Sequence, residues 1–528
     1  MKDSLMSMLM IILLITSVVA AYPIFYSGND KDSYIFSNNP FDFPTVTSSK
    51  SQSNDIGFEN GYNHFDTISI DPSDGLSDEE LSRYVSRSHA RVEYIRNVEF
   101  NNLIPVKIIT STEFLNQEKP VQSSDPIDET VPHGSNHSAW NDQVWEALFI
   151  VGETETSESV ISQTSAQSTA GVYMPSNGEI VIVSESDTIL VISENTLLHE
   201  LTHALQDQEG HLTTIHEIPQ PTQDLQLSVS GLIEGEAAYV EWYYRKICDG
   251  SISARDLSIL HELVWEDWEC IPTPNIPKSS AESSSSSDPN LGVLLILFHP
   301  YSDGLSYIHY LKSQNNWTAI NNKYSSPPVS TEQIIHLSDE QPVQLDISIS
   351  PTKYWKPFSN HGIDGADTVG EASIFSMFWY QSYTYRANAI DDQLFWEGRV
   401  SSNIHGELSP KTIFNYTSIP STGWGNDKLL PLYNDSNDVT EYGYIWATKW
   451  DTTNDAKEFH DSYLKILEAH KAIKIGQSID GKTTLFIISN GPFEDAFAIS
   501  FKGKTVTIVN APTAEDIENI IDSFHLSL

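Results

Sequence analysis

One segment, Leu197 to Gln208, constrains the fold of this chain more than any other. It reads LLHELTHALQDQ and places His199 and His203 four residues apart. On an α-helix, residues four apart lie on one face with Cβ atoms about 5 to 6 Å from each other, so two imidazoles there can bind one metal ion. Apolar residues recur at helical spacing in the same segment, at Leu197, Leu198, Leu201, Ala204 and Leu205. The segment therefore predicts a helix, at least half-buried, that presents both histidines to one point.

Glu200, between the two histidines, adds a chemical role to this pattern. Its carboxylate lies about 100° further round the helix and can reach a water bound to the metal, where it would act as a general base. The five-residue pattern arises by chance in roughly a few per cent of chains of this composition. An apolar helix, however, has little structural use for three polar side chains unless a ligand pairs them. The pattern H-E-x-x-H thus predicts a hydrolytic zinc site with His199 and His203 as ligands and Glu200 as the base.

The third zinc ligand has to come from elsewhere in the chain, because catalytic zinc takes three protein ligands and keeps a fourth position for water. The longer pattern H-E-x-x-H-x-x-G-x-x-H of the metzincins is absent, since Gln206 replaces its Gly and Glu209 its third His. Apolar spacing predicts a second helix at 224–247, which carries the sequence EGEA from Glu234 onward. Glu234 and Glu236 point about 200° apart on a helix, so only one of them can face the metal.

The combination of H-E-x-x-H with E-G-x-A on the next helix resembles the gluzincin metallopeptidases. In that family the third zinc ligand is a Glu on the helix after H-E-x-x-H, and in one large branch this Glu opens the E-G-x-A motif. The resemblance implies Zn²⁺ as the cofactor and Glu234 as its third ligand, with Glu236 as the rival. Asp207, one turn beyond His203, is predicted to accept the second N–H of that histidine.

A broader resemblance extends over most of residues 80–515. Over this range the chain is similar to a family of archaeal exported surface proteins related to gluzincins. That family is defined by sequence rather than by biochemistry. The resemblance therefore bears on fold and location more than on substrate. It rests on the runs HELTHALQDQ, IEGEAAYVE, HPYSDGLSYI (299–308), PPVSTEQIIH (327–336), DTVGEASIFSMFWY (367–380) and VTIVNAPT (506–513).

The N-terminus predicts export. Lys2 precedes an apolar stretch from Leu5 to Ala21 that ends in small residues, as a secretory signal peptide does. The stretch is short for a membrane span, but retention as an N-terminal anchor is the alternative. We therefore expect an extracellular or cell-surface protein, in association with the cell envelope if the anchor is kept.

Cysteine content and charge narrow the setting further. Cys248 and Cys270 are the two cysteines of the chain, and in an exported protein they are either one disulfide or two buried thiols. The formal net charge of −43, from 72 acidic and 29 basic residues, argues against nucleic acid and anionic membrane surfaces as partners.

Composition and local patterns predict an α+β chain with several parts. We expect a signal peptide at 1–21, an irregular segment at 22–75 and a zincin-like (gluzincin) metallopeptidase domain at 76–400, interrupted by a serine-rich loop at 278–288. A C-terminal α+β domain of antiparallel strands and helices is expected at 401–528. A hairpin at 173–184, just before the metal helix, could supply the edge strand that binds an extended peptide.

These features predict a zinc-dependent metallopeptidase that cleaves a peptide or protein substrate. Glu200 would activate the zinc-bound water, and the oxyanion would need a donor. The candidate donors are Tyr173, His211, His216, Tyr301, His336 and His361. The competing hypothesis is a surface or envelope protein that keeps the gluzincin fold and a structural zinc without turnover.

Overall fold

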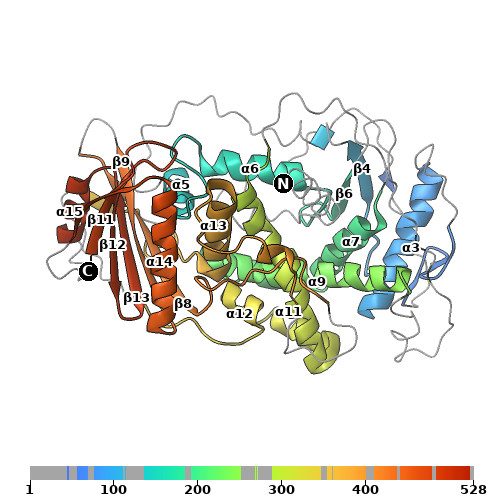
Figure 1. Ribbon diagram of the computed structural model, residues 1–528. Helices are drawn as coiled ribbons and strands as arrows, with labels where there is room; N and C mark the ends of the chain where they lie inside the picture. The colour runs from blue at the N-terminus through green and yellow to red at the C-terminus, as the bar shows by residue number, and fades with distance from the viewer. Residues whose placement is uncertain are drawn as a thin grey trace.

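The computed structural model describes residues 45–46, 56–68, 77–110, 113–114, 136–184, 192–250, 268, 270, 288–345, 354–358, 361–399, 410–436, 440–477 and 483–523 (Figure 1). Helices and strands are mixed along the chain, so the predicted α+β class is confirmed at that level. The expected signal peptide at 1–21 lies outside the described residues. So does nearly all of the serine-rich loop at 278–288.

The first long helix shows how closely local sequence sets local structure. Helix α3 (Asp78–Arg96) begins at Ser77, whose hydroxyl accepts from the backbone N–H of Glu80 while the Glu80 carboxylate accepts from the backbone N–H of Ser77. This reciprocal arrangement is a capping box, and its Ser-x-x-Glu pattern is visible in the sequence. The last three turns of α3 are buried, including three arginines: Arg87, Arg91 and Arg96.

A small mixed sheet lies beside α3. Within the described part of the chain its strand order is β1-β4-β6-β5, with β4 and β6 parallel and β5 antiparallel to β6. The predicted hairpin is confirmed as β5 and β6, joined by a turn in which Gly178 has a positive φ of 60°. The bounds of these strands are β1 (Thr45–Val46), β4 (Val106–Thr110), β5 (Gly171–Met174) and β6 (Glu179–Ser184).

Three helices form the centre of the molecule. Both predicted helices of the metal site are confirmed as α7 and α9, and α9 packs against α7 on one side and α11 on the other. Helices α9 and α11 are in close contact at Gly235 and Gly304. A Cβ added to Gly235 would lie 2.5 Å from the backbone of Gly304, so only a residue without a side chain fits there. The three central helices are α7 (Glu194–Gln208), α9 (Gln223–Cys248) and α11 (Leu291–Lys323), and two short helices lie next to them in the chain, α8 (His211–His216) and α12 (Thr331–His336).

Helix α11 is also the one described helix that is long and apolar enough to cross a membrane by length and composition. In its most apolar window, 89% of the residues are buried inside the protein. Its helical geometry is broken at Asn315 and Asn316. Such burial is typical of a core helix.

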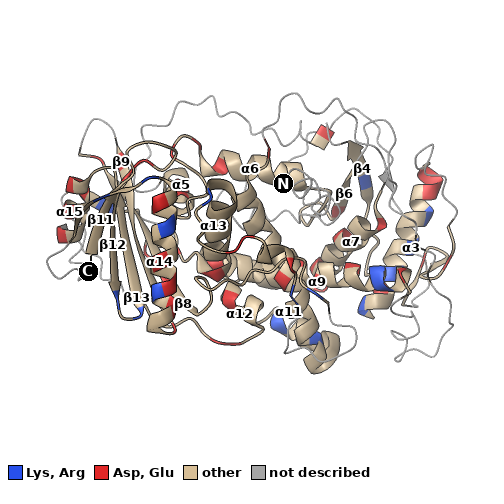
Figure 2. Ribbon diagram, viewed as in Figure 1, with Lys and Arg blue, Asp and Glu red and all other residues tan. Residues whose placement is uncertain are grey.

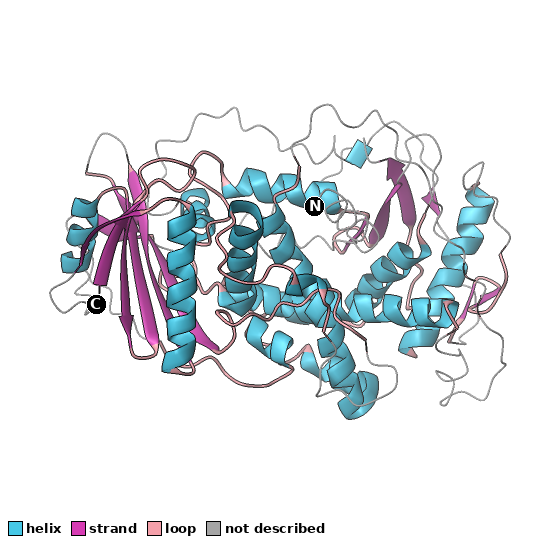
Figure 3. Ribbon diagram, viewed as in Figure 1, coloured by secondary structure: helices cyan, strands magenta, loops and turns pink. Residues whose placement is uncertain are grey.

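An antiparallel sheet forms the other end of the molecule (Figure 3). Within the described residues it has seven strands in the order β10-β11-β12-β13-β9-β8-β7. Strand β7 lies before residue 401, so this sheet draws on residues from both sides of the expected boundary. The expected mixture of antiparallel strands and helices is present after residue 440. The bounds are β7 (Trp355–Pro357), β8 (Trp424–Asn434), β9 (Glu441–Trp450), β10 (Ile473–Gln477), β11 (Thr483–Ile487), β12 (Ala496–Lys502), β13 (Thr505–Ala511), α14 (Thr453–Ala469) and α15 (Ala514–Ser523).

The large sheet and the helical centre of the molecule share a hydrophobic core. Side chains of α5 (His137–Ala147), α11 and α13 (Gly370–Tyr385) form one continuous buried cluster with those of β8, β9, β12, β13 and α14. Helix α6 (Ser157–Ser168) contributes to the same cluster. Acidic positions occur on helices of both ends (Figure 2). The sheet end and the helical centre are thus packed as neighbours rather than joined by a linker.

Cys248 and Cys270 form a disulfide, which resolves the two alternatives left by the sequence. The bond ties the last residue of α9 to the segment that carries Trp268. Trp268 is buried, and its indole N–H donates to His64 at 2.9 Å. The disulfide therefore anchors a core tryptophan against the end of the helix that carries Glu234.

Candidate metal centre

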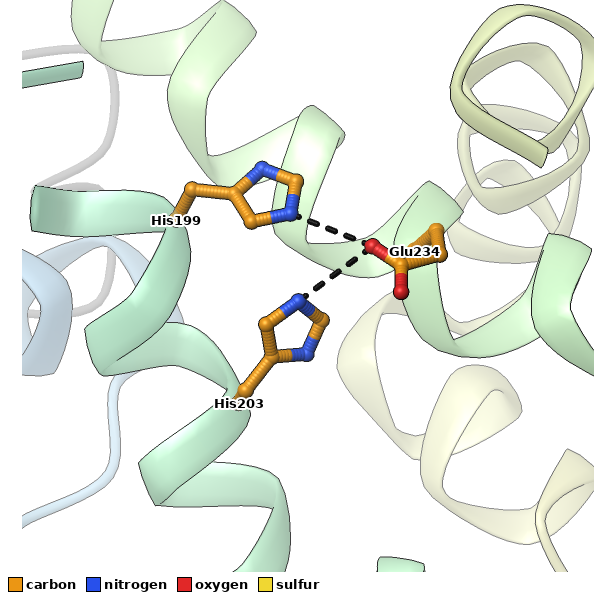
Figure 4. A group of neighbouring side chains, drawn as sticks. All are labelled: His199, His203 and Glu234. Carbon is orange, nitrogen blue, oxygen red and sulfur yellow. Dashed lines mark hydrogen bonds and ion pairs between the residues drawn. The ribbon is translucent and has the colours of Figure 1, made fainter. Parts of the chain in front are cut away.

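Helices α7 and α9 bring together the three residues expected to bind zinc (Figure 4). His199 and His203 come from α7, and Glu234 comes from α9 and lies between them. The Nε2 atom of His199 is 3.2 Å from Oε2 of Glu234, and that of His203 is 3.3 Å from the same oxygen. One ligand atom of each residue lies within 4.8 Å of the others, and all three side chains are buried.

These separations fit a zinc ion. Zinc bonds of about 2.0 to 2.1 Å in a tetrahedron place any two donor atoms about 3.3 Å apart. The distances of 3.2 and 3.3 Å from Glu234 to the two histidines match that value. Two imidazole nitrogens and one carboxylate oxygen are also a donor set that zinc prefers. Two of the three donor separations therefore suit a tetrahedral zinc site, and the third is below 4.8 Å.

The pKa values of two residues in this cluster differ strongly from their ordinary values. Burial alone would lower the pKa of His199, but hydrogen bonds to Glu234 and Glu241 raise it to about 10. Burial alone would raise the pKa of Glu234, but His203 and His199 lower it to about 2. Buried carboxylates thus create a site that stabilises positive charge.

Glu200 lies on α7 between the two histidines and is fully buried. It is close to strand β5, because a Cβ added to Gly171 would lie 3.1 Å from Cγ of Glu200. The charge of Glu200 contributes to the raised pKa values of both His199 and Tyr301. Glu200 therefore lies close to the edge strand, and its charge acts on the residues of the metal cluster.

Tyr301 is the oxyanion candidate whose described contacts reach this cluster. Its ring stacks on that of His199, with centroids 5.7 Å apart and planes 24° apart. Burial raises the pKa of its hydroxyl well above the ordinary value, and the nearby charges of Glu234 and Glu200 raise it further. Tyr301 hence stays protonated at neutral pH and can donate a hydrogen bond.

The other five candidate donors have positions or partners elsewhere. Tyr173 donates to Asp207, and His211 stacks on Tyr324. His336 contacts Glu371, His361 contacts the rings of His137 and Trp140, and His216 is exposed at the end of α8.

The prediction that Asp207 orients His203 is wrong. The Nδ1 atom of His203 lies 2.8 Å from Oε1 of Gln206, three residues along the helix, while Asp207 points toward β5 and accepts from Tyr173 at 2.7 Å. Residues three apart are neighbours on a helix as much as residues four apart are, so spacing alone could not decide. Spacing could have indicated Glu241, two turns after Glu234, whose Oε2 lies 3.7 Å from Nδ1 of His199.

Glu236, the rival ligand, faces away from the metal cluster. Its Oε1 lies 2.6 Å from Nε of Arg96, and its Oε2 accepts from the hydroxyl of Tyr324. The two glutamates of EGEA thus have separate partners, as their angular separation on a helix requires.

Comparison with known proteins gives one family match, in the C-terminal part of the chain. A family described as Domain of unknown function (DUF8575) matches residues 357–521, a region that includes strands β8 to β13 of the large sheet but none of the metal-cluster residues. No curated protein and no solved structure matches the chain.

Proposed function

We propose that this protein is an exported zinc-dependent metallopeptidase with a zincin-like, gluzincin-type domain. His199, His203 and Glu234 would bind Zn²⁺, and Glu200 would be the general base. The proposal rests above all on one observation, the 3.2 and 3.3 Å separations of donor atoms beside a buried Glu200.

The arrangement around the cluster supports a zincin-like fold. Strand β5 is the outermost strand in the described part of the small sheet, runs antiparallel to β6, and packs against α7. An edge strand beside the metal helix offers backbone N–H and C=O groups to an extended peptide. A peptide or protein substrate would therefore bind along β5 with its scissile bond near Glu200.

The residues of this chain have distinct roles in peptide hydrolysis. Bound zinc supplies Lewis acidity toward a carbonyl oxygen and toward water. Glu200 accepts a proton from the attacking water and later passes it to the leaving amine, so that water adds across the C–N bond. Tyr301 donates a hydrogen bond to the carbonyl oxygen of the scissile bond as that oxygen becomes negatively charged.

The test combines metal analysis with an activity assay. The purified protein is expected to contain one zinc and to cleave casein or a mixed peptide library in a chelator-sensitive way. Glu200→Gln should keep zinc and lower turnover by about 100-fold or more. Glu158→Gln, an exposed carboxylate on α6, is the matched control and should leave turnover unchanged.

The outcomes separate the two functional hypotheses. Zinc content with chelator-sensitive melting but no cleavage of any library peptide would favour the non-catalytic surface protein with a structural zinc. Unchanged turnover in Glu200→Gln would contradict its role as the base.

A further inference from the structure

Gln206 occupies a buried position between the metal cluster and a second polar group. It is fully buried on α7, one turn after His203. Its Oε1 lies 2.8 Å from Nδ1 of His203. Its Nε2 donates on the other side, at 3.0 Å to the backbone carbonyl of Ile233, 2.9 Å to the hydroxyl of Tyr324 and 3.2 Å to Oε2 of Glu236.

These partners fix which end of the amide faces which neighbour. The carbonyl of Ile233 and the carboxylate of Glu236 can only accept hydrogen bonds, so the NH₂ end of Gln206 must face them. A flipped amide would set its oxygen against both acceptors and leave its NH₂ toward the imidazole. The oxygen of Gln206 therefore faces His203, and that oxygen needs a donor.

The donor can only be the Nδ1–H of His203. With the proton on Nδ1, the neutral ring keeps a lone pair on Nε2, the atom that lies 3.3 Å from the Glu234 oxygen at the candidate zinc site. The opposite tautomer would carry a hydrogen on Nε2 and could not bind a metal there.

Glu236 and Arg96 hold Gln206 in this orientation. Arg96 is buried, pairs with Glu236 at 2.6 Å and lies over the ring of Trp317 at 4.3 Å. Tyr324 donates to the same carboxylate, which leaves the Tyr324 oxygen to accept from Gln206. The second glutamate of EGEA thus serves as an anchor for Gln206 and not as a ligand.

We propose that Gln206 is a positioning residue that fixes His203 as the Nδ1–H tautomer, and that Glu236, paired with Arg96, fixes Gln206. This inference rests on the proposed zinc site but not on peptide cleavage. A partner of this kind on a ligand histidine changes metal affinity by about 10- to 100-fold.

The first experiment measures zinc affinity by competition with a chelator. Gln206→Leu, close in size but without hydrogen bonds, should weaken zinc binding by about 10- to 100-fold. The matched control is Gln208→Leu on the same helix; its side chain contacts the backbone of Asn101 and Asn102 instead, so zinc affinity should not change. Equal affinity of Gln206→Leu and the unaltered protein would overturn the proposal.

The second experiment reads the tautomer directly. Nitrogen NMR of the metal-free protein at alkaline pH should show the proton of His203 on Nδ1, and an Nε2–H signal would overturn the proposal. This readout needs no activity and no folded variant, so it decides the role of Gln206 even if Gln206→Leu does not fold. An unaltered protein that binds no zinc would contradict the proposed function, while the tautomer would still test Gln206.

Discussion

Two regions of this molecule bury carboxylates, and they do so in different ways. At the metal cluster, Glu234 faces two imidazoles, and its pKa falls to about 2 because the charges and hydrogen bonds of His203 and His199 outweigh its burial. At the junction between the central helices and the large sheet, Asp427 accepts from the backbone N–H groups of Val369 and Gly370 and from the indoles of Trp424 and Trp446. The first carboxylate thus faces two imidazoles, and the second faces neutral donors.

The junction contains further carboxylates of the second kind. Asp367 accepts from the backbone N–H of Gln223 at the start of α9, and Asp224 accepts from Thr331 at the start of α12. Burial and neighbouring carboxylates raise the pKa of Asp224 to about 7 and that of Asp367 to about 8. The comparison teaches that burial alone does not set the pKa of a carboxylate. The groups that face the carboxylate decide whether its pKa falls or rises.

The largest expected effect is at the metal cluster. Glu234→Gln removes the negative ligand and should lower zinc affinity by more than about 100-fold, and hydrolysis with it. Equilibrium dialysis against zinc measures this. Glu217→Gln, an exposed carboxylate after α8, is the control. Full zinc content in Glu234→Gln would mean that the two regions do not differ as described.

A substitution at the junction should lower the stability of the protein but not its zinc content. Asp427→Ala leaves four buried donors without their acceptor, and should lower the free energy of unfolding by about 3 kcal/mol or more. Zinc content per folded molecule should not change. Chemical denaturation checks the stability, with Asp522→Ala on α15 as an exposed control. A loss of zinc with unchanged stability in Asp427→Ala would contradict the prediction that Asp427 stabilises the fold and takes no part in metal binding.

The raised pKa values at the junction predict how stability depends on pH. Because Asp367 and Asp224 bind protons more tightly in the folded state, their contribution is complete below about pH 4 and is lost as the pH rises through about 7 to 8. Asp367→Asn keeps the accepting oxygen and should reduce this loss, which melting temperatures of the metal-free protein at about pH 5 and pH 9 would show. The same loss in Asp367→Asn and Asp522→Asn would contradict the prediction.

The smallest expected effect is a change in turnover after substitutions at the edge strands of the two sheets, β5 and β10. Gly171→Ala in β5 places a Cβ 2.9 Å from Thr196 and 3.1 Å from Glu200, so turnover should fall by about 10-fold as Glu200 is displaced. Gly476→Ala in β10, the edge of the large sheet, meets only Leu485 at 3.3 Å and should leave turnover unchanged. Steady-state kinetics with one peptide substrate measures the turnover. Equal turnover in both variants would contradict the prediction that the contact with β5 positions Glu200.

Much of the fold could be predicted because its periodic patterns are strong. The capping box at Ser77, the helices at 194–208 and 223–248 and the hairpin at Gly178 each carry a local signal that the structure confirms. Strand β8 carries Pro431 and polar residues that weaken its signal, and was not predicted. Its place in the sheet comes from pairing with β9, which local sequence does not encode.

The candidate site could be predicted only in part. His199, Glu200 and His203 form a local motif, and Glu234 depended on a family resemblance. Gln206 escaped notice because its role needs partners from three helices: His203 on α7, Ile233 on α9 and Tyr324 at the end of α11. Contacts across helices of this kind leave no spacing in the sequence.

The contact of Gly235 with Gly304 has a consequence for how this chain can vary. Gly235 follows Glu234, and Gly304 lies one turn after Tyr301, so the two backbones touch beside both side chains. A methyl group at either position would push the helices apart and widen the gap between Glu234 and Tyr301. The two glycines thus act as a spacer of fixed width, and a substitution there would move Glu234 relative to Tyr301 while leaving both side chains intact.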